Sequence, residues 1–251
     1  MLQLLAIDTS TEVCSVAING AGGIVSRQCN TPKSHAKVLL PLIDEVLKES
    51  GNILSDMDAI AVTRGPGSFT GIRIGLGVAQ GLSYGAGLPI IGLSSLHVLA
   101  AHYYSHLCSV GEVGGAPITI VPALDARMSE VYWAAYTFSP SAISSAVVAQ
   151  VCSPSDMLSQ LEEYRNTTIF APGHGWSVEG LTCPPVWVRA PEFKPSADAL
   201  MLLAQQIELP DTPAAEINGS DDSPVVFQAG VVEPLYLRNE VSWKKRQRIR
   251  Q

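Results

Sequence analysis

The sequence contains little charge, no closely paired cysteines and no overall excess of basic residues. Only 16% of its 251 residues are charged and 47% are hydrophobic, which argues against extended disorder and supplies enough apolar material for a full core. The five cysteines are widely spaced and form no C-x-x-C pair, so we predict reduced thiols and neither a disulfide framework nor a zinc site. A net charge of -7 argues against nucleic-acid binding through the overall field of the protein.

Signals for secretion and membrane insertion are also missing. The N-terminus lacks the basic region and the small-residue cleavage site of a signal peptide. The apolar stretch 71–88 is interrupted by Arg73, Gln80 and several glycines, which makes it a poor membrane span. We therefore expect a cytoplasmic protein with no membrane segment.

The most informative segment that is present is a glycine-rich loop at 64–75, RGPGSFTGIRIG. An apolar strand at 59–63 precedes it, a helix starting at Ser68 or Thr70 and ending near Tyr84 follows, and a second strand is expected at 88–93. This order is a βαβ unit, so the sheet is at least partly parallel. The loop matches neither a P-loop nor a Rossmann fingerprint. It can present N–H groups to an anion or allow close packing, and its spacing favours packing.

Two similar hairpins predict that the chain is internally duplicated. A buried strand beginning at Leu4 reaches Asp8 and returns at 14–18, and a second apolar strand, 119–124, reaches Asp125 and returns at 131–136. Helix and strand material follows each hairpin, as a duplicated α/β lobe requires. In the second half we expect strands at 168–172 and 186–189, a second glycine turn at 173–176 and a helix capped by Ser196.

Two helices of the first half have features that a single buried face does not need. The helix expected at 32–50, with a kink or junction at Pro41, carries a broad apolar stripe. The next helix contains several interior glycines, each of which costs about 1 kcal/mol relative to alanine. Both helices are either well buried or packed against a partner chain as well. On the second interpretation, the candidate partner interface consists of His35, Val38, Leu39, Leu42, Ile43, Val46, Gly71, Arg73, Gly75 and Gly81.

The sequence contains no complete set of side chains that is typical of a catalytic or metal-binding site. Asp8 and Asp125 could each hold a magnesium-bound phosphate, but neither is followed by the glycines that close approach needs. His102 and His106 have the spacing of a helical metal pair without a third ligand nearby. We therefore predict no catalytic, cofactor-binding or metal-binding residues.

The C-terminal residues reverse the charge of the chain. Five of the seven residues in 244–250 are basic. The default interpretation is a solvated tail, and the alternative is contact with RNA phosphates through Lys244, Lys245, Arg246 and Arg248. The polar segment 210–224 is expected to be a mobile loop.

Together these segments resemble the TsaB family, also called YeaZ. The resemblance is carried by the glycine loop, the Asp125-Ala126-Arg127 hairpin with 130–133, and the segments 5–10, 14–17, 91–96 and 234–239, and it weakens over 190–232. It implies an α/β, actin-like and Hsp70-like (ASKHA) fold with two lobes of duplicated βββαβα topology. The implied division is an N-terminal lobe at 1–110, a C-terminal lobe at 116–230 and a C-terminal segment at 231–251.

The resemblance also implies a function. Members of this family are non-catalytic subunits of the complex that forms N6-threonylcarbamoyladenosine at position 37 of tRNAs that read ANN codons. The implied partners are the catalytic subunit TsaD, the ATPase TsaE, TsaC, which supplies threonylcarbamoyl-adenylate, and tRNA through the complex, with a homodimer as the assembly of the isolated chain. TsaD carries an H-x-x-x-H metal pair where our alignment places Ser95 and Leu99, so no metal or other cofactor is expected here.

Two other activities stay open as alternatives. One is an M22-type metallopeptidase, which needs a metal ligand set. The other is an ASKHA-fold phosphotransferase, which needs glycines that approach a nucleotide phosphate. Fold alone does not decide between them.

Overall fold

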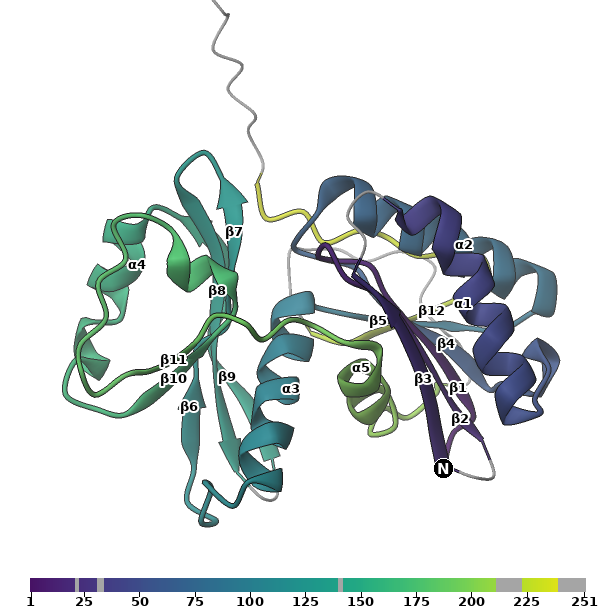
Figure 1. The fold of residues 1–251 in the computed structure, drawn as a ribbon, viewed down its shortest axis with the longest axis horizontal. Helices are drawn as coiled ribbons and strands as arrows, with labels where there is room; N and C mark the ends of the chain where they lie inside the picture. The colour runs from purple at the N-terminus through teal and green to yellow at the C-terminus, as the bar shows by residue number, and fades with distance from the viewer. Residues whose placement is uncertain (21–22, 31–33, 140–141, 211–222, 239–251) are drawn as a thin grey trace, which may run out of the picture.

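Two α/β lobes lie side by side in the computed structural model, which describes residues 1–20, 23–30, 34–139, 142–210 and 223–238 (Figure 1). Each lobe is built on one β-sheet with helices against its faces. Within these described ranges, no helix is both long and apolar enough to cross a membrane.

The first half of the chain builds the first sheet. Its strands lie in the order β3-β2-β1-β4-β5, with β1 antiparallel to β2 and parallel to β4, and with β4 parallel to β5. These parallel pairs confirm the βαβ unit that the glycine loop predicts. The elements are β1 (Leu4–Asp8), β2 (Cys14–Gly20), β3 (Gly23–Cys29), α1 (His35–Ser50), η1 (Leu54–Asp56), β4 (Ala59–Thr63), α2 (Phe69–Ala86), β5 (Ile90–Leu93) and α3 (Ser95–Ser109).

The second half builds a second sheet in the same way. Strands β6 and β7 both pair antiparallel with β8, β9 pairs with β8 on its other side, and β10 is parallel to β6 and β11. The elements are β6 (Ile118–Ile120), β7 (Ala123–Arg127), β8 (Glu130–Ser139), β9 (Ala142–Cys152), α4 (Pro154–Gln160), η2 (Glu162–Tyr164), β10 (Ile169–Pro172), η3 (His174–Ser177), β11 (Val188–Ala190) and α5 (Ala197–Ala204).

The two sheets therefore share one strand order, which confirms the predicted duplication. Strands β6 and β7 together occupy the place of β1, and β8, β9, β10 and β11 occupy the places of β2, β3, β4 and β5. One expectation was wrong: 119–124 is not a single strand but is interrupted between β6 and β7. Pro122 lies at the interruption, and proline has no N–H to donate to a strand ladder.

The division of the chain between the lobes also differs from the expected boundaries at 110 and 116. Helix α3 comes from the first half but packs on β8 and β10, whereas α5 comes from the second half and packs on β1, β2 and β4. Strand β12 (Val225–Phe227) pairs antiparallel with β5 at the edge of the first sheet. The physical reason is that the first sheet has a second apolar face, opposite α1 and α2. Leu4 and Ala6 on this face pack against Leu200 of α5.

Helices α1 and α2 cover the other face of the first sheet. Leu39, Ile43 and Val46 place one apolar stripe of α1 in the core, and Gly51 ends the helix in a left-handed conformation. Pro41 lies on the exposed side and does not divide α1 into two pieces, contrary to one of the two expectations for it. Ser68 caps α2 by accepting a hydrogen bond from the backbone N–H of Gly71 at 3.3 Å.

The end of the described chain, residues 228–238, forms a C-terminal strap that runs back along α2 (Figure 1, yellow). The Gly230 N–H donates to the Ser83 hydroxyl at 2.9 Å, the Gln80 amide donates to the Val232 carbonyl at 3.1 Å, and the Leu235 N–H donates to the Arg64 carbonyl at 2.7 Å. The strap therefore follows α2 from its C-terminal end to its N-terminal end.

Candidate functional site

The glycine loop packs against the turn between β1 and β2. A Cβ atom added at Gly67 would lie under 3.0 Å from the Ser10 carbonyl oxygen, and one added at Gly71 or Gly75 would lie equally close to oxygens of Thr9. The Thr9 hydroxyl also donates to the Gly71 carbonyl at 2.8 Å. Close packing, the favoured interpretation of this loop, is confirmed by these contacts.

Asp8 lies beneath this turn and is fully buried. Its Oδ1 accepts hydrogen bonds from the hydroxyls of Thr63 at 2.6 Å and Ser10 at 2.7 Å, and from the Ser10 N–H at 3.2 Å. Burial raises the pKa of this carboxyl, and these hydrogen bonds only partly oppose it. Asp8 thus organises the turn from inside and does not line the cleft between the lobes.

Asp125 occupies the corresponding place in the second lobe but contacts the cleft. Its carboxylate pairs with Arg127 at 2.9 Å, and its backbone N–H donates to Nδ1 of His174 at 3.1 Å. Burial lowers the pKa of His174, which favours the neutral ring that can accept this hydrogen bond. The two strand ends that look alike in sequence therefore have different surroundings.

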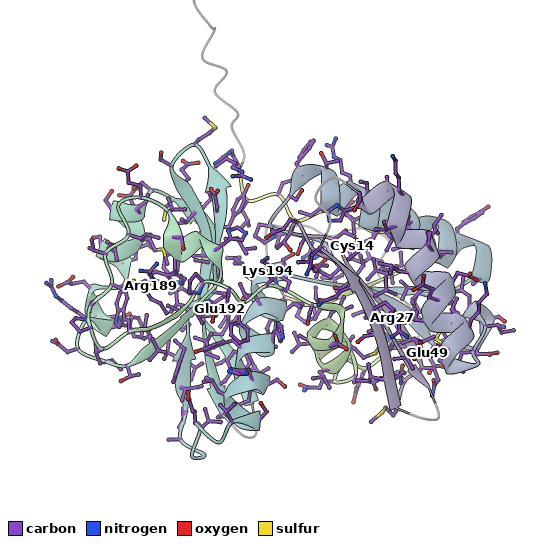
Figure 2. All side chains as sticks on the ribbon, viewed as in Figure 1. Cys14, Arg27, Glu49, Arg189, Glu192 and Lys194 are labelled. Carbon is purple, nitrogen blue, oxygen red and sulfur yellow. The ribbon has the colours of Figure 1, made fainter. Side chains whose placement is uncertain are left out.

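A cleft of about 870 Å³ separates the lobes. It is lined by the β1–β2 turn, the first turn of α2, the β7–β8 turn and the end of the strap. Glu12, which lines the cleft, pairs with Lys194 at 2.6 Å, and Figure 2 shows Lys194 between the two lobes. Arg238 closes the other side, since it donates to the Ala126 carbonyl at 3.1 Å and pairs with the Glu130 carboxylate.

The histidines considered as metal ligands pack against aromatic rings. His102 and His106 both lie against Phe193, with ring centroids 5.4 and 4.9 Å apart, and Nδ1 of His102 bonds the Lys194 carbonyl at 2.7 Å. Ser95 and Leu99, which our alignment places at the sister subunit's histidine positions, are buried. In the part of the chain that the structure describes, no group of three His, Cys, Asp or Glu side chains could hold a metal ion.

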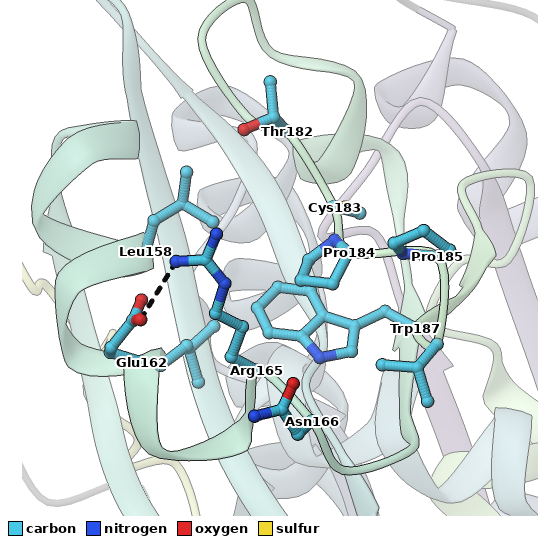
Figure 3. A pocket seen from close by; sticks show the side chains of 11 residues that line it. Leu158, Glu162, Arg165, Asn166, Thr182, Cys183, Pro184, Pro185 and Trp187 are labelled. Carbon is cyan, nitrogen blue, oxygen red and sulfur yellow. Dashed lines mark hydrogen bonds and ion pairs between the residues drawn. The ribbon is translucent and has the colours of Figure 1, made fainter.

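A separate pocket of about 610 Å³ lies on the second lobe, away from the cleft (Figure 3). Arg165 pairs with Glu162 at 3.0 Å on one side, and Trp187 forms the floor and donates to the Tyr164 carbonyl at 3.0 Å. The sequence carried no signal for this pocket because its lining comes from α4, η2 and the segment 182–187, none of which carries a motif.

The residues predicted as a partner interface separate into two groups. Side chains of one group point into the first lobe: His35, Leu39, Ile43 and Val46 are buried, and Gly71 and Gly75 face Thr9. These residues therefore pack within the first lobe, and His35 and Gly71 also line the cleft between the lobes. The second group is accessible and consists of Val38, Leu42, Arg73 and Gly81.

Other accessible residues of α1 and α2 were missed because a periodicity search rewards buried positions. Leu40 and Tyr84 are 54% and 80% exposed. Gly77, Gly81 and Gly85 are exposed at four-residue spacing, and a Cβ added at any of them would meet no atom within 4 Å. We call Val38, Leu42, Tyr84 and these three glycines the α1–α2 face. The basic residues from Lys244 onward lie outside the described residues.

Comparison with known proteins gives concordant results. Residues 9–182 match the family model described as TsaD, tRNA N6-adenosine threonylcarbamoyltransferase. The tRNA threonylcarbamoyladenosine biosynthesis protein TsaB of Haemophilus influenzae is 36% identical and is aligned over 97% of each chain. That of Escherichia coli is 34% identical over 97% of this chain and 98% of its own.

Solved structures show the same relationship. YeaZ from Pseudomonas aeruginosa is 36% identical, with a TM-score of 0.69, and the match covers 82% of this chain and 91% of that one. A crystal structure described as an uncharacterized protein with similarity to peptidase YeaZ, also from Pseudomonas aeruginosa, is 33% identical with a TM-score of 0.73 and covers 95% and 100%.

Proposed function

We propose a scaffolding role for this chain, which belongs to the TsaB (YeaZ) family of tRNA threonylcarbamoyladenosine biosynthesis proteins. Its two-lobed, actin-like fold is that of the family. It acts as a subunit in the biosynthesis of threonylcarbamoyladenosine. In our proposal it is non-catalytic, and it pairs with a TsaD-type catalytic subunit through the α1–α2 face.

The observation that carries this proposal is the set of three open glycines on α2. A Cβ added at Gly77, Gly81 or Gly85 would meet no atom of the described residues within 4 Å, although each glycine costs about 1 kcal/mol relative to alanine in a helix interior. Glycines at this spacing allow another backbone to approach closely. Tyr84, which is 80% exposed and follows Gly81 by three residues in the same helix, adds apolar area that a partner would bury.

The surroundings of the two aspartates support a non-catalytic role. Asp8 is buried beneath the β1–β2 turn, holds the Thr63 and Ser10 hydroxyls, and does not line the cleft in which a bound phosphate would lie. Ser95 and Leu99 supply no metal ligand to match the sister subunit's histidines. These features disfavour the phosphotransferase and the metallopeptidase alternatives.

The remaining partners follow from the same proposal. A TsaE-type ATPase joins the pair in the cytoplasm, a TsaC-type enzyme supplies the activated threonylcarbamoyl group, and tRNA binds to the complex. When the catalytic subunit is absent, a second copy of this chain covers the α1–α2 face, since duplicated lobes of related proteins offer similar surfaces.

The decisive experiment places a charge on the α1–α2 face. Gly81→Glu should abolish binding to the catalytic subunit, because the carboxylate would be buried without a partner. The variant should remain folded, since glutamate is a better helix former than glycine. Ser105→Glu, which adds the same charge at an exposed position of α3, serves as the control. The measurement is calorimetric titration with the catalytic subunit, together with threonylcarbamoyladenosine formation on tRNA. Unchanged binding by folded Gly81→Glu protein would remove the α1–α2 face from the proposal.

A further inference from the structure

Two of the five cysteines lie opposite each other in the first sheet. Cys14 begins β2 and Cys29 ends β3, and the two residues are direct partners in this antiparallel strand pair. Figure 2 shows Cys14 in the first lobe. Direct partners of an antiparallel pair have Cα atoms about 4.5–5.5 Å apart and side chains on the same face, and a disulfide needs Cα atoms roughly 4.4–6.8 Å apart. Strand pairing therefore brings two thiols that are distant in sequence within bonding range.

Both side chains point to the face of the sheet that α1 covers. Cys14 belongs to the same buried cluster as Leu39 of α1, and α1 packs on both β2 and β3. The next residue of β2, Ser15, points to the opposite face, where its hydroxyl accepts a hydrogen bond from the Ala197 N–H of α5 at 3.0 Å. A bond between Cys14 and Cys29 would therefore lie inside the first lobe, on its α1 side.

The two thiols differ in their access to solvent. Cys14 is 1% exposed, and burial raises the pKa of its thiol to about 12, so it is protonated at neutral pH. Cys29 is only half-buried, and it lies on β3, the outermost strand of this sheet among the described residues. A reagent in solution can therefore reach Cys29 first, and Cys14 can react only with a sulfur beside it.

The other three cysteines, all within the described residues, are placed differently. Cys152 lies opposite Val131 of β8 and accepts a hydrogen bond from the Trp133 indole N–H at 3.1 Å. Cys108 lies in α3, and Cys183 lies outside the strands at the pocket of the second lobe. An intramolecular disulfide is therefore expected at one place, the β2–β3 strand pair.

We propose that Cys14 and Cys29 form a reversible cross-strand disulfide by exchange with a low-molecular-weight disulfide such as oxidised glutathione. The Cys29 thiolate attacks one sulfur of the reagent, which forms a mixed disulfide and releases one thiolate. Cys14 then gives up its proton and attacks the Cys29 sulfur, which forms the cross-strand bond and releases the second thiolate. In total the two protein thiols lose two electrons and two protons, and the reagent gains both as two thiols. Reduced glutathione reverses the steps, and such transient disulfides are the kind that a reducing compartment allows.

The expected consequence is local to the edge of the sheet. No residue of β3 is buried, and segments with few buried contacts open more readily than core strands. A bond to β2 removes the motions that separate the two strands. Amide hydrogen exchange across β3 should therefore slow in the oxidised protein, while exchange in the central strand β4 should not change.

The test incubates the full, folded chain with oxidised glutathione and follows it by intact mass and by peptide mapping without reduction. Wild-type protein should lose the mass of two hydrogen atoms and yield a peptide that joins Cys14 to Cys29. This product should exceed the glutathione adduct at Cys29 by about tenfold or more, because the attack by Cys14 is intramolecular. Cys14→Ala should accumulate the adduct at Cys29, and Cys29→Ser should leave Cys14 reduced. Excess reduced glutathione should restore the wild-type mass.

Cys108→Ser is the matched control, because it removes an exposed thiol that lies outside the strand pair. It should form the cross-strand bond like the wild type. The proposal is overturned if folded wild-type protein carries glutathione at Cys29 while Cys14 stays reduced, or if the joined peptide appears only after denaturation. It is also overturned if Cys29 bonds a different cysteine of the same chain. Circular dichroism checks the fold of each variant, and the wild-type peptide map decides alone if Cys14→Ala does not fold.

Discussion

The two lobes share a strand order but differ in the segment that follows one pair of matching strands, β4 in the first lobe and β10 in the second. In the first lobe, β4 leads into the 18-residue helix α2, and a Cβ added at its outer glycines would meet no atom of the described residues within 4 Å. In the second lobe, β10 leads into η3, only four residues long, which buries Trp176 against Trp187. One lobe thus keeps a helical face for a partner, and the other closes its core. A duplicated sheet can serve two purposes when only its connections change.

What the lobes keep in common is the close contact of a glycine with the end of the first strand. Gly67 meets Ser10 in the first lobe, and Gly173 meets Ala123 in the second. In each case a Cβ would lie under 3.0 Å from a backbone carbonyl oxygen, which cannot move aside as a flexible side chain can. The contact belongs to the shared fold and not to the partner face.

The largest effect that we predict separates these packing glycines from the open ones. Gly71→Ala and Gly173→Ala should each lower the free energy of unfolding by about 3 kcal/mol, because the added Cβ overlaps backbone oxygen. Gly77→Ala, in the same helix as Gly71, should raise it by about 0.5–1 kcal/mol. Urea denaturation followed by circular dichroism measures all three. Equal stability of Gly71→Ala and wild type would contradict the packing role of the glycine loop.

Much of this comparison could be predicted from the sequence, and for a physical reason. The Asp8 and Asp125 hairpins, the βαβ unit and the Ser196 cap are local patterns, and local patterns fix strands, turns and helix starts. The exchange of α3 and α5 between the sheets could not be predicted in this way, because it depends on which apolar face lacks a cover once both sheets exist. The same limit hid β12, three residues long, which is a strand only because the edge of β5 is open to it.

The site was predictable to a smaller extent. Periodicity selected Leu39, Ile43 and Val46, but it cannot tell a stripe that faces its own sheet from one that faces another chain. The glycines of α2 were visible, yet only the structure separates Gly71 and Gly75, which face Thr9, from Gly81, which faces open space. Contacts of the strap join residues about 110 to 160 positions apart, and no local pattern reports such a contact.

The second prediction concerns the two aspartates that occupy matching places. Burial raises the pKa of Asp8 above its ordinary value of 3.8, so the folded protein binds a proton that the unfolded chain has released. Stability contributed by this group is therefore fully present below pH 3.8 and is lost as the pH rises through the folded-state pKa. Asp8→Asn, which keeps an oxygen acceptor for Thr63 and Ser10, should flatten this decline. Urea midpoints measured across acidic and neutral pH test it, and an unchanged pH profile would contradict the assignment.

The smallest expected effect concerns the contact that joins the lobes at the strap. Arg238 is mostly buried, and it satisfies the Ala126 carbonyl and pairs with Glu130 on either side of the β7–β8 turn, which has left-handed backbone. Arg238→Gln should lower the free energy of unfolding by about 1 kcal/mol, because Glu130 is still partly exposed and water can replace its partner. The local effect should be larger than the global one: amide hydrogen exchange at 127–130 should accelerate, while exchange in α2 should not. Arg165→Gln removes an exposed ion pair within the second lobe and should change neither measurement. If Arg238→Gln, like the control, left exchange in the β7–β8 turn unchanged, the turn would hold its left-handed backbone without the strap, and the two lobes would be coupled mainly through α3 and α5.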